Sequence, residues 1–194
     1  MQRFAPKKLL LLAGVSFSVL MLFFTFGLLH IDDADDQIYF NLISHNNQPV
    51  SESDIQGHFS LVFFGFTHCP DVCPTQMSFI RRLMQSLDQS KPGHSVKPLF
   101  ITVDPKVDTP QVLANYVGFF DTRIVGLTGS EAAIARAARA FKAIAPFASQ
   151  QDKSQHSAII YVVAPDGRIV DFISTSTNIG KAADTLNARL NAWI

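Results

Sequence analysis

The sequence predicts a single α/β domain with a mixed sheet, preceded by one segment that is long and apolar enough to span a membrane. Short runs of β-branched and aromatic residues alternate along the chain with segments of helical spacing, which is typical of an α/β fold. The chain ends in a β-hairpin and a helix, so we expect antiparallel as well as parallel strands. With 194 residues, 47% of them hydrophobic, the chain has room for one such domain and an N-terminal appendage.

The appendage contains a predicted membrane anchor. Residues 9–29 carry no charged side chain and are numerous enough to cross a hydrocarbon core as a helix. Arg3, Lys7 and Lys8 precede them, and no other Lys or Arg occurs before Arg81. The positive-inside rule therefore predicts a cytoplasmic tail over residues 1–8 and a single-pass protein of the inner (cytoplasmic) membrane, with its domain in the periplasm. A cleaved signal peptide is the alternative, but the run is long for one and lacks a small-x-small cleavage site.

An acidic linker is expected over residues 30–37, where four aspartates follow the anchor. Their spacing does not match a calcium-binding loop, so we interpret the stretch as solvated. The domain then occupies residues 38–194. Its first element is a predicted β-hairpin, formed by residues 39–43 and the region around Val50, with Asn46 and Asn47 in a turn that favours left-handed backbone.

The remaining elements follow in alternation. The apolar run 61–66 predicts a buried strand, and apolar residues at steps of three and four from Met77 to Leu87 predict a helix after it. A loop is expected over residues 91–97 and a strand over 99–103. Thr109 before Pro110 predicts the start of a helix that runs to residue 119 or 120. Residues 124–127 are a short apolar run that we expect at an edge of the sheet.

The last third of the chain predicts two helices and a strand pair. Ser130 is expected to cap a helix over residues 131–144, which Pro146 would end. Residues 158–163 and 168–173 form the predicted hairpin around the turn Pro165-Asp166-Gly167. A helix over residues 179–193 closes the domain.

Both cysteines of the protein, Cys69 and Cys73, lie in the turn between strand 61–66 and the following helix. The free N–H groups and the dipole at a helix start favour thiolate over thiol. If the helix begins near Asp71 or earlier, the two positions share one face, with Cβ atoms about 5–6 Å apart. That separation allows a disulfide, or two thiolates on one metal ion. Pro70 and Pro74 fit the start of a helix.

The alternative is a purely structural disulfide, which would only cross-link the turn between Cys69 and Cys73. A bridge across so short a loop removes little entropy from the unfolded chain and therefore stabilises poorly. A domain of this size can also build its core without one. The balanced charge, 16 basic and 16 acidic side chains, gives no electrostatic case for nucleic acid as a partner.

The stretch from Phe64 to Pro74, Phe-Gly-Phe-Thr-His-Cys-Pro-Asp-Val-Cys-Pro, resembles the signature of the Sco/SenC family of thioredoxin-like copper proteins, which act in cytochrome c oxidase assembly. Further matching stretches follow in the same order and extend the resemblance over residues 39–172: Val103-Asp104-Pro105, Asp108-Thr109-Pro110, Gly126-Leu127-Thr128-Gly129, His156-Ser157, Tyr161 and Pro165-Asp166-Gly167.

This resemblance implies a thioredoxin-like mixed sheet flanked by helices, an N-terminal anchor, and one copper ion per chain, as Cu(I) or Cu(II), held by Cys69, Cys73 and His156. Two thiolates and an imidazole are a soft, mixed set that suits copper in either state. A closed zinc site would be one ligand short. Three positions depart from the family pattern, but none is a ligand: Gln155 for a common Asp, Asn47 for Gly and Val107 for Arg.

The other histidines carry less weight as ligands. We interpret His68, beside Cys69, as a side chain that tunes the thiol or faces solvent. Asp71, between the cysteines, is interpreted as a helix-start carboxylate. The rest lie in expected loop or linker segments: His30, His45, His58 and His94.

Three functions compete at this stage. The first is a copper chaperone for a cytochrome c oxidase subunit or another periplasmic copper protein. The second is a thiol-disulfide oxidoreductase that uses Cys69 and Cys73 as redox-active residues and keeps a copper-accepting site reduced. Such enzymes usually carry Cys-x-x-Cys, and thioredoxins place a proline where this chain has Gln155-His156-Ser157. A peroxidase, for which only the fold argues, ranks third.

Overall fold

The computed structural model describes residues 38–90, 96–143 and 159–193. The predicted anchor, the acidic linker and His156 lie outside these residues. Within the described part of the chain, no helix is long and apolar enough to cross a membrane.

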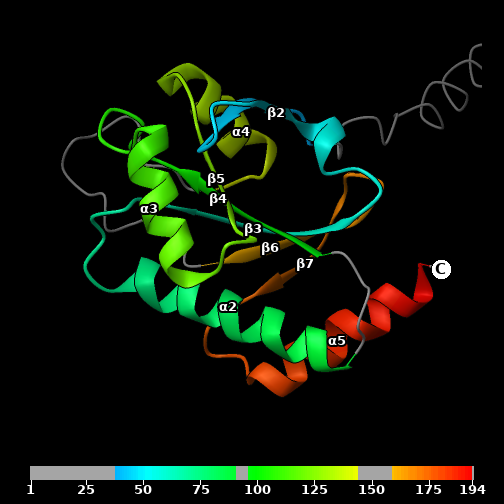
Figure 1. Ribbon diagram of the computed structural model, residues 1–194. Coiled ribbons are helices and arrows are strands. Elements are labelled where there is room, and N and C mark those ends of the chain that lie inside the picture. The colour runs from blue at the N-terminus through cyan, green and yellow to red at the C-terminus, as the bar shows by residue number, and fades with distance from the viewer. Residues whose placement is uncertain (1–37, 91–95, 144–158, 194) are drawn as a thin grey trace, which may run out of the picture. The chain divides into compact units, whose positions relative to one another are not determined.

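The sheet has seven strands in the order β2-β1-β5-β4-β3-β6-β7 (Figure 1). Strand β3 is parallel to β4, and β4 is parallel to β5, whereas the other neighbours are antiparallel. The predicted mixed sheet is therefore confirmed. The strands are β1 (Asn41–Ser44), β2 (Pro49–Ser51), β3 (Phe59–Gly65), β4 (Val96–Thr102), β5 (Val125–Thr128), β6 (Ile160–Val163) and β7 (Ile169–Ile173).

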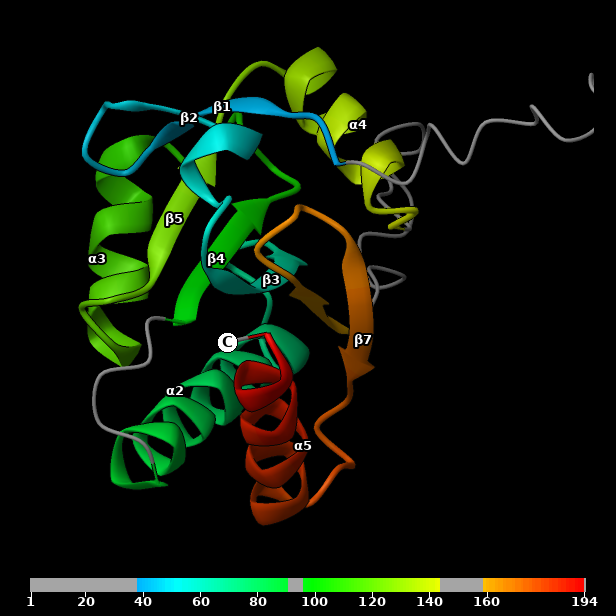
Figure 2. The same cartoon turned by 90° about the vertical axis from the view of Figure 1, so that its right-hand side faces the viewer.

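Four α-helices and one short 3-10 helix accompany the sheet in the described residues: η1 (Glu52–Asp54), α2 (Val72–Ser90), α3 (Pro110–Phe120), α4 (Glu131–Ala140) and α5 (Ile179–Ala192). Helices α2 and α5 pack side by side, and α3 packs on β5 beside α2. The two views place α4 across the sheet from α2 and α5 (Figures 1 and 2). The sheet is thus covered on both faces.

The N-terminal hairpin forms as predicted, with Leu42 opposite Val50. Asn47 has φ of 61°, so it provides the left-handed residue that the turn needs. The hairpin also overturns one expectation. Strand β5 is not at an edge, because β1 pairs with it and joins Ile43 to Thr128. An N-terminal segment that comes far earlier in the chain thus covers this side of the sheet.

Two other predicted boundaries are wrong. Strand β4 begins at Val96 rather than after Pro98. Pro98 is tolerated inside β4 because β5 pairs with this strand only over Leu99–Ile101, beyond the proline. Helix α4 ends at Ala140 rather than at residue 144.

The end of α4 is a Schellman motif. Lys142 has φ of 52°, its N–H bonds the carbonyl of Arg139 at 2.9 Å, and the N–H of Ala143 bonds that of Ala138 at 2.8 Å. A lysine takes the left-handed position that glycine usually occupies, so the sequence carried no signal for this stop.

Strand β3 is the centre of the domain, and all seven of its residues are buried. Its side chains alternate between two aromatic clusters. Phe63 packs against Phe100 with ring centroids 5.9 Å apart, whereas Phe64 packs against Phe141 at the end of α4, at 5.3 Å. Strand β3 is therefore packed on both faces; it leads into the cysteine turn, residues 66–71, which joins β3 to α2.

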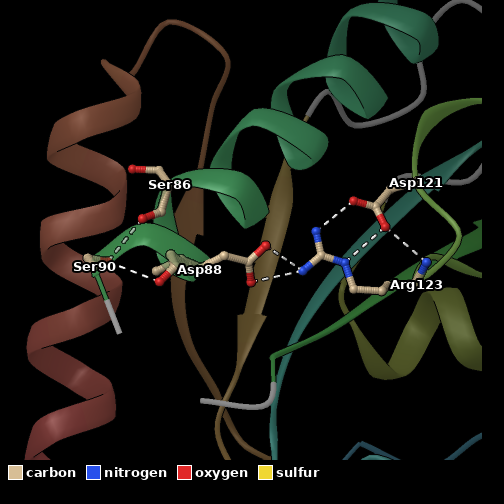
Figure 3. A network of polar contacts seen from close by, with 6 residues as sticks. Ser86, Asp88, Ser90, Asp121 and Arg123 are labelled. Atoms are coloured by element: carbon tan, nitrogen blue, oxygen red, sulfur yellow. Dashed lines mark hydrogen bonds and ion pairs between the residues drawn. The ribbon is translucent and has the colours of Figure 1, made fainter. Parts of the chain in front are cut away.

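The far end of α2 is tied down by Arg123 (Figure 3). Its guanidinium donates to both carboxylate oxygens of Asp88 on α2, at 2.9 and 2.8 Å, and to Asp121 in the loop after α3, at 2.9 and 2.7 Å. On the other side, the amide of Asn187 in α5 donates to the hydroxyl of Ser90 at 2.8 Å. The C-terminal end of α2 is thus bonded to Arg123 on one side and to α5 on the other.

Candidate dithiol metal site

Cys69 and Cys73 lie where β3 passes into α2. No disulfide joins them, and their exposed fractions are 6% and 0%. The N–H of Cys73 donates to the sulfur of Cys69 at 3.4 Å, so the first sulfur faces the first turn of the helix. Helix α2 begins at Val72, whereas a shared helical face for the two cysteines requires a start near Asp71 or earlier. Cys69 therefore precedes the helix and does not share a helical face with Cys73; the contact between them runs from the main-chain N–H of Cys73 to the sulfur of Cys69.

Burial decides the protonation of Cys73. Removal from water raises the pKa of its thiol far above the ordinary value, because the thiolate loses hydration. A hydrogen bond from the backbone at Phe66 acts in the opposite direction but is the smaller effect. The expectation that the helix start would favour the thiolate is therefore wrong for Cys73. Burial, which the sequence does not show, outweighs the backbone hydrogen bond at Phe66.

Gly65, the last residue of β3, makes room for Cys73. A Cβ atom at this position would lie 2.8 Å from the Cys73 sulfur and 2.9 Å from the ring of Phe100. Real Cβ contacts are not this short, so only glycine lets the second sulfur pack against the strand. This role was missed from sequence, where Gly65 was noted only as part of the family signature.

The turn before Cys69 is bound to a buried carboxylate. Asp108 is fully buried and accepts hydrogen bonds from the N–H of Thr67 at 3.0 Å, the hydroxyl of Thr67 at 2.6 Å and the hydroxyl of Thr102 at 2.5 Å. The Nδ1 atom of His68 lies 3.6 Å from the same carboxylate and 3.1 Å from the Thr67 hydroxyl. His68 is thus oriented toward Asp108, with half of its side chain exposed.

Tyr116 is a second residue that sequence reasoning missed. It lies on α3 with its ring 5.4 Å from that of Phe100, and its buried hydroxyl has no hydrogen-bond partner in the described part of the chain. Burial raises the pKa of Tyr116 above its usual range, and the nearby Cys73 and Cys69 add to this effect. Tyr116 is therefore a neutral phenol within electrostatic range of the two cysteines.

The structure brings Cys69 and Cys73 together, while His156, the third predicted ligand, lies outside the described residues. In the described ranges, no three His, Cys, Asp or Glu side chains are grouped so as to hold a metal ion. The interpretation of His45 as a turn residue is confirmed. Its Nδ1 accepts a hydrogen bond from the N–H of Gly126 at 3.0 Å, which joins the hairpin to β5.

A model of the SCO1/SenC family matches residues 30–191, so the chain belongs to this family. The mitochondrial SCO2 homologue of Danio rerio is 36% identical over 159 residues, which cover 80% of this chain and 57% of that protein. The mitochondrial SCO1 homologue of Homo sapiens is 32% identical over 158 residues, which cover 79% of this chain and 52% of that protein. The chain thus spans little more than half the length of these two relatives.

Solved structures confirm the thioredoxin-like Sco fold. The copper-bound ScoI of Arabidopsis thaliana superposes with a TM-score of 0.73 at 28% identity, covering 81% of this chain and 99% of that one. The copper-bound ScoI of Bradyrhizobium japonicum superposes with a TM-score of 0.68 at 34% identity, covering 78% and 98%.

Proposed function

We propose that this protein is a copper chaperone for respiratory cytochrome c oxidase, and that Cys69, Cys73 and His156 hold one copper ion as its cargo. One observation carries the proposal: two buried cysteines lie side by side where β3 passes into α2, and the N–H of Cys73 donates to the sulfur of Cys69 at 3.4 Å. Copper bound to the Arabidopsis and Bradyrhizobium relatives supports this cargo, and membership of the SCO1/SenC family supports the oxidase as recipient.

The chemistry of the turn suits a soft ion. Thiolate sulfur selects Cu(I) over hard cations, and the turn offers two such ligands in surroundings almost free of water. Because the pKa of Cys73 is raised, this thiol remains protonated until a metal displaces the proton. Copper uptake should therefore release protons, and the affinity should increase with pH.

Strand topology supports His156 as the third ligand. Strand β6 is antiparallel to β3, and Ile160 pairs with Phe63, two residues before Gly65. The chain therefore enters β6 at the end of the sheet where β3 leads into the cysteine turn. His156 precedes Ile160 by four residues (160 − 156), a length of chain that reaches at most about 14 Å when extended.

The test is Cu(I) loading of the reduced protein in competition with a chromophoric chelator. We expect one ion in the wild type, no tight binding in Cys69→Ser, and weaker binding in His156→Ala. His58→Ala, which changes a loop histidine outside the ligand set, is the matched control and should bind as the wild type does. Tight zinc binding without a preference for copper would contradict the proposal.

A thiol-disulfide oxidoreductase is the second candidate, because two cysteines that lie four positions apart (73 − 69) and are in contact can close into a disulfide. The two functions separate in His156→Ala, which removes no sulfur. If oxidase assembly fails in this variant while disulfide formation is intact, the metal site carries the function. If assembly proceeds normally in His156→Ala but not in Cys69→Ser, thiol exchange carries it.

The anchor belongs to the same proposal. Residues 9–29 would hold the protein in the inner membrane, with residues 38–194 in the periplasm. The domain could then deliver copper to a recipient on the periplasmic side. A reporter enzyme that folds only outside the cytoplasm, fused after Ile194 of the full chain, should be active. Activity of a reporter that requires the cytoplasm would contradict this topology.

A further inference from the structure

A carboxylate outside the proposed ligand set binds the cysteine turn to the neighbouring loop. Asp108 lies in the segment between β4 and α3, and its side chain has an exposed fraction of 0%. Thr67 and Thr102, which donate to it, are 41 and 6 positions away in sequence. The carboxylate thus joins the end of β3, the end of β4 and the start of α3.

The hydrogen bonds at Asp108 are arranged so that each carboxylate oxygen has a donor from the cysteine turn. Oδ1 accepts the hydroxyl of Thr67, and Oδ2 accepts the main-chain N–H of the same residue. Such a two-point attachment fixes both the position and the orientation of Thr67. A buried charged group is stable only when it is hydrogen-bonded in this way.

The side toward β4 is equally defined. The hydroxyl of Thr102 donates to Oδ2 at 2.5 Å and accepts the N–H of Asp104 at 2.9 Å, so both its donor and its acceptor functions are used. The N–H of Asp108 in turn donates to the carbonyl of Asp104 at 2.9 Å. The carboxylate of Asp108 is therefore fixed by Thr102 on the side of β4, and it binds Thr67 on the side of the turn before Cys69.

The attachment acts two residues before Cys69. The N–H of Cys69 donates to the carbonyl of Phe66 at 3.2 Å, so the turn from Phe66 to Cys69 is closed around Thr67. Movement of Thr67 would rotate this turn and shift the sulfur of Cys69. The sulfur of Cys73 would not follow, because it is packed against Gly65 and the aromatic rings of β3 and β4.

We propose that Asp108 is a positioning residue of the site: its carboxylate, through Thr67, sets where the sulfur of Cys69 lies relative to that of Cys73. The inference rests on the proposed function only in that the thiol pair is taken to be the working part of the site. It predicts that the equilibrium constant for disulfide formation between Cys69 and Cys73 depends on Asp108, which acts through its hydrogen bonds to Thr67.

The experiment measures the equilibrium constant for disulfide formation between Cys69 and Cys73 against glutathione, which reports the effective concentration of one thiol at the other. The variants are Asp108→Asn, Thr67→Val and their combination. We expect the constant to fall about tenfold in Asp108→Asn, the ratio that corresponds to one hydrogen bond to a charged group. In the double variant the constant should fall no further than in Asp108→Asn, because the Thr67 hydroxyl acts only through the carboxylate that Asp108→Asn has already removed.

Two controls separate positioning from support of the fold. Thr102→Val removes a hydroxyl from the same carboxylate, but on the side of β4, and should change the constant less than Thr67→Val does. Asp171→Asn removes a carboxylate that pairs with Arg189 at 2.8 Å between β7 and α5, and should leave the constant unchanged. Urea unfolding of each variant shows how much stability is lost.

A merely structural Asp108 would lower the free energy of unfolding while the constant in the folded protein stays within about twofold of wild type. That result would overturn the proposal. If Asp108→Asn does not fold, Thr67→Val provides the test, since it keeps the main-chain bond to the carboxylate and removes only the hydroxyl bond. A constant within about twofold of wild type in Thr67→Val would then overturn the proposal. The measurement contains no copper, so failure of the copper proposal would appear separately, as a wild type that binds no Cu(I).

Discussion

At the scale of single residues, the site depends on how closely the backbone of β3 approaches Cys73. The absence of a side chain at Gly65 lets the second sulfur reach a fully buried position, and that burial keeps the thiol protonated. The missing side chain at Gly65 thus affects both the packing and the acid–base state of Cys73.

Gly65→Ala should destabilise the protein and disturb the site together. The added methyl group overlaps Cys73 and Phe100, and overpacking of this kind costs about 1–3 kcal/mol. Urea unfolding measures the loss. Gly118→Ala in α3 is the control, because its Cβ would meet no atom within 4 Å and alanine is the better helix former. Equal stability of Gly65→Ala and wild type would show that the close approach is not real.

Cys73 also predicts how stability depends on pH. Its pKa is raised in the folded state, so the stability due to the buried thiol is fully present below the ordinary pKa of 9.0 and is lost as the pH rises above it. The free energy of unfolding of the reduced protein should fall by at most about 1.4 kcal/mol per pH unit from this group. Cys73→Ala should lack this contribution in urea titrations above pH 9, and identical slopes for both proteins would contradict it.

At the scale of elements, the start and the end of α2 are held by different devices. The start is bound through the turn that Asp108 holds, and the end through the ion pairs of Arg123 with Asp88 and Asp121. The latter group is a surface network, so we expect it to orient the helix more than to stabilise the domain.

Asp121 provides the test at this scale. Its hydrogen bond with Arg123 holds the pKa of the carboxyl below its usual range. A depressed pKa stabilises the fold above the ordinary pKa, and the gain is lost as the pH falls through the folded value. Asp121→Asn should therefore cost up to about 1 kcal/mol near neutral pH and less in acid, measured by urea unfolding. Asp166→Asn, which breaks the exposed pair with Arg168, is the control and should change little. A loss that is independent of pH would contradict this account of Arg123.

Local patterns predicted most elements because they carry their own signals. Thr109 caps α3 with Pro110 behind it, as its spacing predicts, and the apolar steps from Met77 to Leu87 became the buried face of α2. The errors arise where a distant segment decides. The local sequence places β5 at an edge because no residue near it indicates its pairing with β1, and it predicts too long an α4 because a lysine at position 142 does not indicate left-handed backbone.

The candidate site divides in the same way. The two cysteines were predicted from their place between a strand and a helix, whereas Asp108 and Tyr116 were assigned no role. The link from Thr67 to Asp108 joins positions 41 apart and depends on burial, so one sequence alone offers no signal for it. The raised pKa of Cys73 was missed for the same reason.

At the scale of the whole molecule, the topology joins the parts of the proposed site. Strand β3 leads into the turn that contains Cys69, β4 leads into the loop that contains Asp108, and β6 begins beside the end of β3 (Figure 1). The last of these supports the proposal that His156 is a copper ligand, because β6 begins four residues after His156 (160 − 156).

The most direct measurement of that claim is X-ray absorption at the copper edge of the reduced, Cu(I)-loaded protein, compared with the loaded His156→Ala variant. We predict one copper ion per chain with two sulfur ligands and one nitrogen ligand, and loss of the nitrogen in the variant while both sulfurs remain. A wild-type spectrum with sulfur ligands alone, or a nitrogen that persists in His156→Ala, would contradict the assignment.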